Sequence, residues 1–219
     1  MTPTYWDEAK IALKKRDKTL GKIIGSYRGE TMALRGDAFF TLARSITGQQ
    51  ISVKAADSVW KKLVAAVTPS PTLPPNGGGR SKVMTPEIIA NTDSVILRGC
   101  GLSTRKVLYL HALANHFLEN KKLIKRWPAM TDQEIIAELT SIHGIGRWTA
   151  EMFLIFGLGR PDVFPLADLG LLKGIYRHYN KGEKLPLAEV IAIGERWQPF
   201  RSAGTWYMWR ALDPVPVAY

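Results

Sequence analysis

The residues best suited to do chemistry lie between positions 139 and 170. One helix ends and another begins in a short segment that holds two glycines, Leu139-Thr140-Ser141-Ile142-His143-Gly144-Ile145-Gly146-Arg147-Trp148-Thr149-Ala150. Glycines let a backbone approach a ligand closely, and a helix N-terminus offers unpaired N–H groups and a positive dipole end. A phosphate group suits such a site. A plain turn between packed helices is the alternative, because a Gly-x-Gly pair alone is a weak motif.

An aspartate, Asp168, directly precedes the apolar helix predicted over 169–179. Taken by itself, Asp168 is most simply an N-cap, whose side chain accepts a hydrogen bond from the first turn of the helix. Its neighbours between 164 and 169 are apolar, which strengthens the electrostatic effect of a carboxylate at short range. Such a carboxylate can also stabilise positive charge that develops on a bound molecule, and the two roles are compatible.

Helices must position these residues, because apolar residues recur at helical spacing along nearly the whole chain and no convincing strand-like alternation is present. The pattern predicts an all-α protein. Its helices are expected over 6–25, 37–47, 52–67, 86–98, 103–119, 131–140, 145–157, 168–179, 186–194 and 199–212. The stretch 68–80 is rich in proline and holds three consecutive glycines, so it is predicted to be a mobile loop.

Composition narrows the class of protein. The 219 residues are 46% hydrophobic and 22% charged, which fits one or two globular domains. Thirty Lys and Arg against nineteen Asp and Glu give a formal net charge of +11, which favours a polyanionic partner, nucleic acid above all. The single cysteine, Cys100, excludes a disulfide framework and a cysteine-ligated zinc or iron–sulfur site within this chain. No histidine pair has metal-ligand spacing, so we expect no catalytic metal and no cofactor.

Four lysines, Lys10, Lys14, Lys18 and Lys22, recur every four residues in the first predicted helix. This spacing favours a solvated basic face, with contact to DNA as the alternative. The N-terminus lacks the features of a secretory signal, and no apolar run approaches the ~18 residues of a membrane span. We therefore expect an intracellular protein without a membrane partner, cytoplasmic in a bacterium or nuclear in a eukaryote.

The two-glycine segment resembles the hairpin of the helix-hairpin-helix DNA glycosylase superfamily, through Ile142-x-Gly144-Ile145-Gly146-Arg147-x-Thr149-Ala150. In that superfamily the hairpin is followed by a Gly/Pro-rich loop and then an aspartate. Both follow here in the same order, in Gly157-Leu158-Gly159-Arg160-Pro161-Asp162-Val163-Phe164-Pro165-Leu166-Ala167-Asp168. The segments 45–52, 101–106 and 197–210 resemble its DNA-3-methyladenine glycosylase II branch, and the resemblance covers most of residues 5–212.

The resemblance implies an all-α, two-domain helix-hairpin-helix DNA glycosylase fold with a DNA-binding cleft between the domains. It places a central helical barrel at 36–160, with the helix-hairpin-helix at about 131–157. Residues 1–35 and 161–219 would form the second helical domain. The chain looks like a compact form without the N-terminal β-domain of some longer relatives. The implied partner is double-stranded DNA that contains damaged bases, and we expect a monomer.

The resemblance also implies a reaction. Asp168 would be the catalytic residue, stabilising the oxocarbenium-like transition state as the N-glycosidic bond of an alkylated purine breaks. Asp162 and Asp213 do not occupy the family's aspartate position. Trp148 stands where bifunctional members carry a nucleophilic lysine, so water is the expected nucleophile and the strand stays intact. The expected activity is therefore that of a monofunctional glycosylase acting on 3-methyladenine and 7-methylguanine, which leaves an abasic site.

Further site residues follow from the same resemblance. The implied substrate pocket contains Trp148, Met152, Leu169, Trp206 and Trp209, although core packing is the simpler reading of any one tryptophan. Aromatic rings suit cationic alkylpurines through cation–π attraction. Met152 and Leu169 replace tyrosines of some relatives. The implied DNA contacts are Gln49, Gln50, Gly144, Ile145, Gly146, Arg147 and Thr149, with Gln50 filling the gap that the flipped base leaves. A monovalent cation would be held by the backbone carbonyls of Thr140, Ile142 and Ile145.

Two other functions remain open from the residues alone. One is a related glycosylase that acts on deaminated or oxidised bases. The other is a non-catalytic helix-hairpin-helix protein that binds DNA through its phosphates, in which Asp168 serves only as a helix cap.

Overall fold

The computed structural model describes residues 1–68 and 84–212, and within these ranges every regular element is a helix. The predicted all-α class is confirmed. Most of the predicted loop at 68–80, and Asp213, lie outside the described residues. The chain divides into two compact units, with residues 1–36 and 151–212 in unit 1 and residues 37–150 in unit 2.

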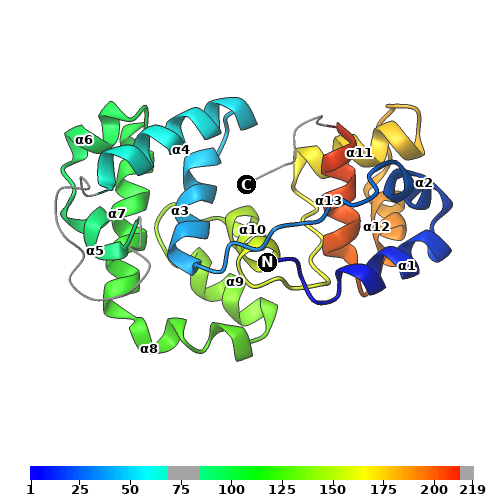
Figure 1. The fold of residues 1–219 in the computed structure, drawn as a ribbon, viewed down its shortest axis with the longest axis horizontal. Coiled ribbons are helices and arrows are strands. Elements are labelled where there is room, and N and C mark those ends of the chain that lie inside the picture. The colour runs from blue at the N-terminus through cyan, green and yellow to red at the C-terminus, as the bar shows by residue number, and fades with distance from the viewer. Residues whose placement is uncertain (69–83, 213–219) are drawn as a thin grey trace. The chain divides into compact units, whose positions relative to one another are not determined.

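Unit 1 is built around its last helix. Its helices are α1 (Trp6–Arg16), α2 (Lys18–Ser26), the part of α10 (Arg147–Phe156) from residue 151, α11 (Leu169–Tyr179), α12 (Leu187–Arg196) and α13 (Arg201–Leu212) (Figure 1). Every residue of α13 from Ser202 to Arg210 is buried, and this helix packs against α1, α2, α11 and α12. Gly174 lets α11 and α13 approach closely, since a Cβ there would lie 2.9 Å from Met208 Cβ.

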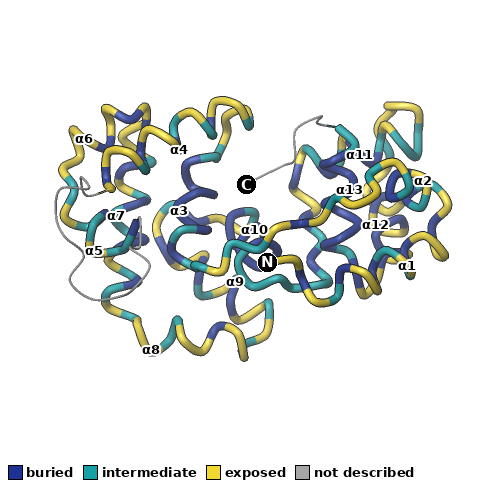
Figure 2. Tube along the Cα trace, viewed as in Figure 1, coloured by how far each residue is buried: buried dark blue, intermediate teal, exposed yellow. Residues whose placement is uncertain are grey.

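Unit 2 is organised by α3 (Ala38–Gly48) and α7 (Thr104–Glu119), which pack against each other. Figure 2 shows the buried stretch of α3, in which all residues from Thr41 to Thr47 are buried. The remaining elements are α4 (Val53–Val67), α5 (Pro86–Asn91), α6 (Ser94–Gly99), α8 (Lys121–Ile124), the short 3-10 helix η1 (Trp127–Ala129), α9 (Asp132–Thr140) and the first turn of α10.

Two predicted helices are each divided in the structure. The predicted helix over 6–25 breaks at Asp17, whose backbone is extended and whose side chain caps α2 by accepting the Leu20 N–H at 3.0 Å. The predicted helix over 86–98 breaks at Thr92, and Asp93 then caps α6. In both places an aspartate starts a new helix because its carboxylate satisfies a first-turn N–H. The short elements α8 and η1 were not predicted.

Asp17 is also the polar centre of unit 1. Its Oδ2 accepts hydrogen bonds from the Tyr179 hydroxyl at 2.8 Å, the Trp197 indole at 3.2 Å and the Arg196 guanidinium at 3.1 Å. Burial favours the neutral carboxyl, but the hydrogen bonds from Leu20 N–H and from these three side chains together hold the pKa of Asp17 below its ordinary value. One carboxylate thereby joins the α1–α2 turn to the ends of α11 and α12.

We predict that Asp17→Asn lowers the free energy of unfolding by about 2–4 kcal/mol at pH 7, because the amide cannot accept this set of donors. The depressed pKa of Asp17 means that its stabilisation is complete above the unfolded carboxyl pKa of ~3.9 and disappears as the pH falls through the lower folded value. Urea unfolding of wild type and variant at pH 7 and at a series of pH values below about 4 measures both effects. The exposed Asp7→Asn serves as the control and should change little, and an equally small change for Asp17→Asn would contradict the prediction.

Candidate functional site

The two-glycine segment forms a turn between α9 and α10, as its sequence predicts. A capping box fixes the start of α9, in which the Thr131 hydroxyl accepts the Glu134 N–H and the Glu134 carboxylate accepts the Thr131 N–H. Gly144 adopts a φ of +89°, and a Cβ there would lie 2.0 Å from the ring of Tyr109 on α7. Gly144 is therefore required both by the backbone conformation and by the packing of an aromatic ring against the turn. A Cβ at Gly146, by contrast, would meet open space.

Gln49, at the C-terminus of α3, ties its own loop to this turn. Its Nε2 donates to the Gly144 carbonyl at 3.1 Å and to the Thr149 hydroxyl at 3.0 Å. Thr149 is buried. The end of α3 is held a second time by Lys106, whose Nζ donates to the Thr47 carbonyl at 2.7 Å, and partial burial lowers the pKa of this lysine. Gln49 and Thr149, both implied DNA contacts, thus also bond to each other within unit 2.

Gln50 occupies a different environment from its neighbour. It is exposed, and its φ of +57° is rare for a residue that carries a side chain. Arg147 and Gly146 at the start of α10 are also exposed, Trp148 is partly exposed, and Ile145 is buried beneath the turn. Unit 2 therefore has an exposed glutamine at positive φ, Gln50, and a glycine directly before the N-terminus of α10. The side-chain amide of Gln49 links the loop that carries Gln50 to the turn before α10.

In unit 1, the segment between α10 and α11 is braced by the start of α13. Arg201 forms a two-point ion pair with Asp162, with Nε–Oδ1 at 2.7 Å and Nη2–Oδ2 at 2.9 Å. The Ser202 hydroxyl accepts the Val163 N–H at 3.0 Å and donates to the Arg160 carbonyl at 2.7 Å. Asp162 thus has a structural partner, in agreement with its absence from the family's aspartate position. These bonds fix the path of the chain as it approaches Asp168.

Asp168 is the N-cap of α11, as predicted, and it is only 5% exposed. Its Oδ1 accepts the Leu171 N–H at 2.6 Å and the Trp209 indole N–H at 2.7 Å. Gly170 leaves room for this arrangement, since a Cβ there would lie 2.9 Å from the Trp209 ring and 3.1 Å from Asp168 Oδ1. The carboxylate is held in one orientation by a helix N-terminus, which also favours its negative charge, and by an aromatic donor.

The other residues implied for the pocket have different surroundings. Trp209 is buried and stacks on Phe156, with ring centroids 5.8 Å apart. Trp206 is buried against Trp6, 5.2 Å away edge to face, and so belongs to the aromatic core of unit 1. Met152 is fully buried in α10, whereas Leu169 is 70% exposed directly after Asp168. Within unit 1, the structure brings together Asp168 and Trp209 from the implied set.

Sequence reasoning missed the residues that hold the site in shape. These contacts join segments that are far apart in the chain, and no local sequence motif predicts them. The residues that make them are Arg201, Ser202, Lys106 and Tyr109. The one available signal was Gly144, because a glycine in a tight turn can admit a close neighbour, although the sequence does not identify that neighbour as Tyr109. Among residues 1–68 and 84–212, no cluster of His, Cys, Asp and Glu could hold a metal ion, and no helix is both long and apolar enough to cross a bilayer.

Two helices joined by a turn with a glycine at positive φ, followed along the chain by a hydrogen-bonded loop and a buried N-capping aspartate, agree with the helix-hairpin-helix class of DNA repair proteins. The chain belongs to the HhH-GPD superfamily of base excision DNA repair proteins, whose family model matches residues 43–199.

Relatives and solved structures agree with this membership. The chain is 34% identical to DNA-3-methyladenine glycosylase 1 of Schizosaccharomyces pombe, over 94% of this chain and 88% of that protein. It is 31% identical to a solved structure of S. pombe 3-methyladenine DNA glycosylase in complex with abasic DNA, with a TM-score of 0.76 over 93% of this chain and 95% of the other. It is 30% identical to a solved structure of a DNA-3-methyladenine glycosidase from Bacillus halodurans. That match has a TM-score of 0.72 and covers 95% of this chain and 90% of the other.

We predict that Gly144→Ala and Gly146→Ala differ sharply, although the two glycines are neighbours in one motif. Gly144→Ala should lower the free energy of unfolding by about 2–4 kcal/mol, because an alanine is strained at positive φ and its Cβ displaces the Tyr109 ring. Gly146→Ala should leave folding nearly unchanged. Thermal unfolding of both variants measures the difference, and similar losses at the two positions would refute the assignment.

Proposed function

We propose that this protein is a monofunctional DNA glycosylase of base excision repair. It flips alkylated purines of the 3-methyladenine and 7-methylguanine type out of double-stranded DNA and hydrolyses their N-glycosidic bonds, leaving an abasic site. One observation carries the proposal, namely the buried Asp168 carboxylate held through Oδ1 by the Leu171 and Trp209 N–H groups. Family membership and the names of the similar proteins support the substrate class.

Asp168 acts on the sugar. As the bond between the base and C1′ breaks, its electron pair leaves with the base and positive charge builds on the sugar ring. A fixed carboxylate stabilises this charge, and it needs no reorganisation during the reaction because its hydrogen bonds are already in place. The carboxylate then orients or deprotonates the water that adds to C1′. An alkylated purine is already cationic, so it leaves as a neutral base without prior protonation.

The absence of a nucleophilic side chain at position 148 supports the monofunctional assignment. Trp148 replaces the lysine of bifunctional relatives, and an indole forms no Schiff base with the sugar. Trp148 instead offers a partly exposed aromatic face, on which a flipped base can stack. Its attraction for a cationic purine would be about 0.5–2 kcal/mol.

In unit 2, the turn and the loop at Gln50 engage the duplex. We assign backbone N–H groups around Gly146, Arg147 and Thr149 to a DNA phosphate, and Gly144 and Ile145 to the shape of the turn. The exposed Gln50 fills the space of the flipped base and bonds to its partner, while Gln49 keeps this loop in register with the turn.

A monovalent cation fits the turn chemically. The donors are neutral carbonyls of Thr140, Ile142 and Ile145 without a carboxylate, a set that suits a weakly bound ion of single charge better than a divalent one. The Ile142 carbonyl already accepts the Ile145 N–H at 3.0 Å, so it faces the inside of the turn. A bound cation would supply electrostatic attraction for a DNA phosphate.

In unit 1, Trp209 orients Asp168, and Leu169 offers an apolar contact to the base. Met152 and Trp206 support the site through core packing, given their burial. We further propose that the protein acts as a monomer in the compartment that holds the genome, the bacterial cytoplasm or the eukaryotic nucleus.

The first test is Asp168→Asn. Asparagine is also a good N-cap, so the fold should persist, whereas loss of the negative charge should slow base release by at least about 100-fold. Methylated duplex DNA is incubated with each protein, free bases are quantified by chromatography, and strands are run on gels with and without alkali. Wild type should release 3-methyladenine or 7-methylguanine and yield breaks that depend on alkali.

Two results would change the proposal. Wild-type excision by Asp168→Asn would remove this residue from catalysis. No release from methylated DNA by the wild-type protein would direct attention to deaminated and oxidised bases, and failure on those as well would favour a DNA-binding protein without catalysis.

Trp209→Phe tests the positioning role of the indole. The variant keeps an aromatic ring against Phe156 but loses the N–H bonded to Asp168, so we expect kcat to fall roughly 10- to 100-fold with a smaller change in KM. Trp197→Phe is the matched control, because it removes an indole N–H from Asp17 in the same unit. The control should lower thermal stability and leave kcat intact. Equal kcat losses in the two variants would mean that Trp209 acts only through stability.

A further inference from the structure

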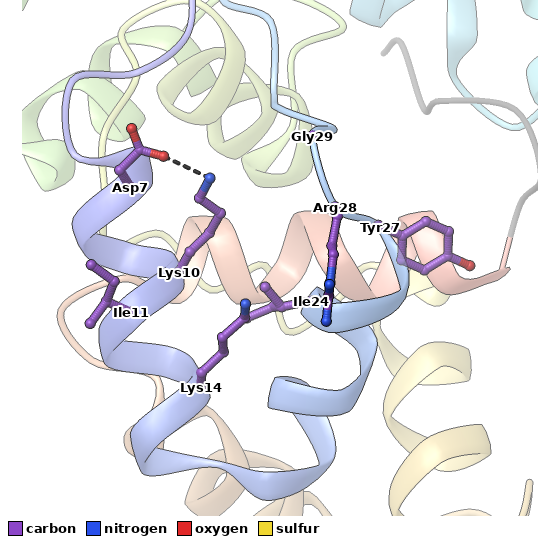
Figure 3. Close-up of a pocket in the computed structure, with 8 residues that line it drawn as sticks. All are labelled: Asp7, Lys10, Ile11, Lys14, Ile24, Tyr27, Arg28 and Gly29. Atoms are coloured by element: carbon purple, nitrogen blue, oxygen red, sulfur yellow. Dashed lines mark ion pairs between the residues drawn. The ribbon is translucent and has the colours of Figure 1, made fainter.

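Unit 1 has a second polar feature that the proposed reaction does not use. A pocket of about 370 Å³ opens between α1 and the end of α2, as Figure 3 shows. Its lining is Asp7, Lys10, Ile11, Lys14, Ile24, Tyr27, Arg28 and Gly29. The set contains three cations and one carboxylate, so the pocket is positive.

The helix break at Asp17 creates this arrangement. It folds the predicted continuous lysine row into two helices, so that Lys10 and Lys14 on α1 face the segment after α2, while Lys18 and Lys22 do not line the pocket. The helices pack tightly near the break, where a Cβ at Gly21 would lie 3.2 Å from the Lys14 carbonyl oxygen. The pocket lies beyond this contact, toward Asp7 and Arg28.

The cations of the pocket are incompletely neutralised. Asp7 pairs with Lys10, with Nζ–Oδ1 at 2.6 Å. Within the described parts of the chain, Lys14 and Arg28 have no carboxylate within ion-pair distance. Three other arginines of unit 1 do have such partners, since Arg196 pairs with Asp17, Arg201 with Asp162 and Arg210 with Glu30. Two cations that converge on a concave surface repel each other unless an anion joins them.

We propose that this pocket binds a phosphate group, held by Lys14 and Arg28 and supported by Lys10. Arg28 offers a planar fork of donors and Lys14 a compact charge, and both are phosphate-binding groups. Asp7 holds Lys10 at one side of the pocket. The mostly exposed Ile11 and the buried Ile24 provide an aliphatic wall beside the cations, against which a sugar can rest.

A phosphate of this kind has two sources, a nucleic acid strand and a free nucleotide. The exposure of Lys14 and Arg28 favours the strand, because a continuous backbone can reach open side chains without being enclosed. The residues that line this pocket include neither Asp168 nor the turn at Gly144, and binding there does not depend on which base is excised.

The test uses the full chain with Lys14→Gln/Arg28→Gln, and Lys15→Gln/Lys22→Gln as the control. The control removes the same charge from exposed residues of α1 and α2 that do not line the pocket. Calorimetry measures binding to an undamaged DNA duplex over a range of salt concentrations and, separately, to deoxyadenosine monophosphate. Undamaged DNA keeps the result independent of excision, so failure here is distinguishable from failure of the proposed function. Poly-L-glutamate serves as a competitor without phosphate.

If a strand phosphate occupies the pocket, the pocket variant should bind duplex several-fold more weakly than the control. Its slope of log affinity against log salt should also be shallower by about one, the expected loss for one phosphate contact. If a free nucleotide is the occupant, the pocket variant alone should lose binding of the monophosphate. Equal behaviour of the two variants in both arms, or competition by poly-L-glutamate as strong as that by DNA, would overturn the proposal.

Discussion

The site in unit 1 depends on holding a carboxylate that is almost removed from water. Burying a charge costs free energy unless hydrogen bonds replace its hydration. At Asp168 two hydrogen bonds replace part of this hydration, because the Leu171 N–H in the first turn of α11 and the Trp209 indole N–H both donate to Oδ1. The same carboxylate therefore organises the start of α11 and is itself held in one orientation. The hydrogen bonds of Arg201 and Ser202 fix the path of the loop that precedes Asp168.

Close backbone approach is the second constraint, and glycines meet it in both units. Gly170 admits the Trp209 ring beside Asp168, and Gly174, one turn later, lets α11 lie close to α13. In unit 2, Gly144 accepts the Tyr109 ring at its Cα and takes the positive φ of the turn. Gly146, two residues later, has open space beside it instead. The glycines of the motif thus divide into one that the fold requires and one that is free to face a ligand.

Local sequence signals predicted much of this, and long-range contacts account for the rest. The apolar spacing located α3, α4, α7 and α9–α13 to within about two residues, and Asp168 was recognisable as an N-cap because capping is a local property. The same rule applied to Asp17 would have divided the first helix, but the regular lysine spacing concealed the break. The Asp168–Trp209 bond joins positions 41 residues apart, and the Gln49 bonds to Gly144 and Thr149 span 95 and 100. No short pattern encodes such contacts, so the partners of the site emerged only from the tertiary structure.

The proposed chemistry follows from the groups that the chain provides. A side chain that attacks the sugar must be a nucleophile that is deprotonated when it attacks. Electrostatic stabilisation needs only a charge whose position and direction are fixed before the reaction begins. Asp168 is locked by a helix N-terminus and an indole, and Trp148 provides no nucleophile. In the proposed reaction, a structural N-cap can therefore also serve as the catalytic group, because the attacking oxygen comes from water rather than from the protein.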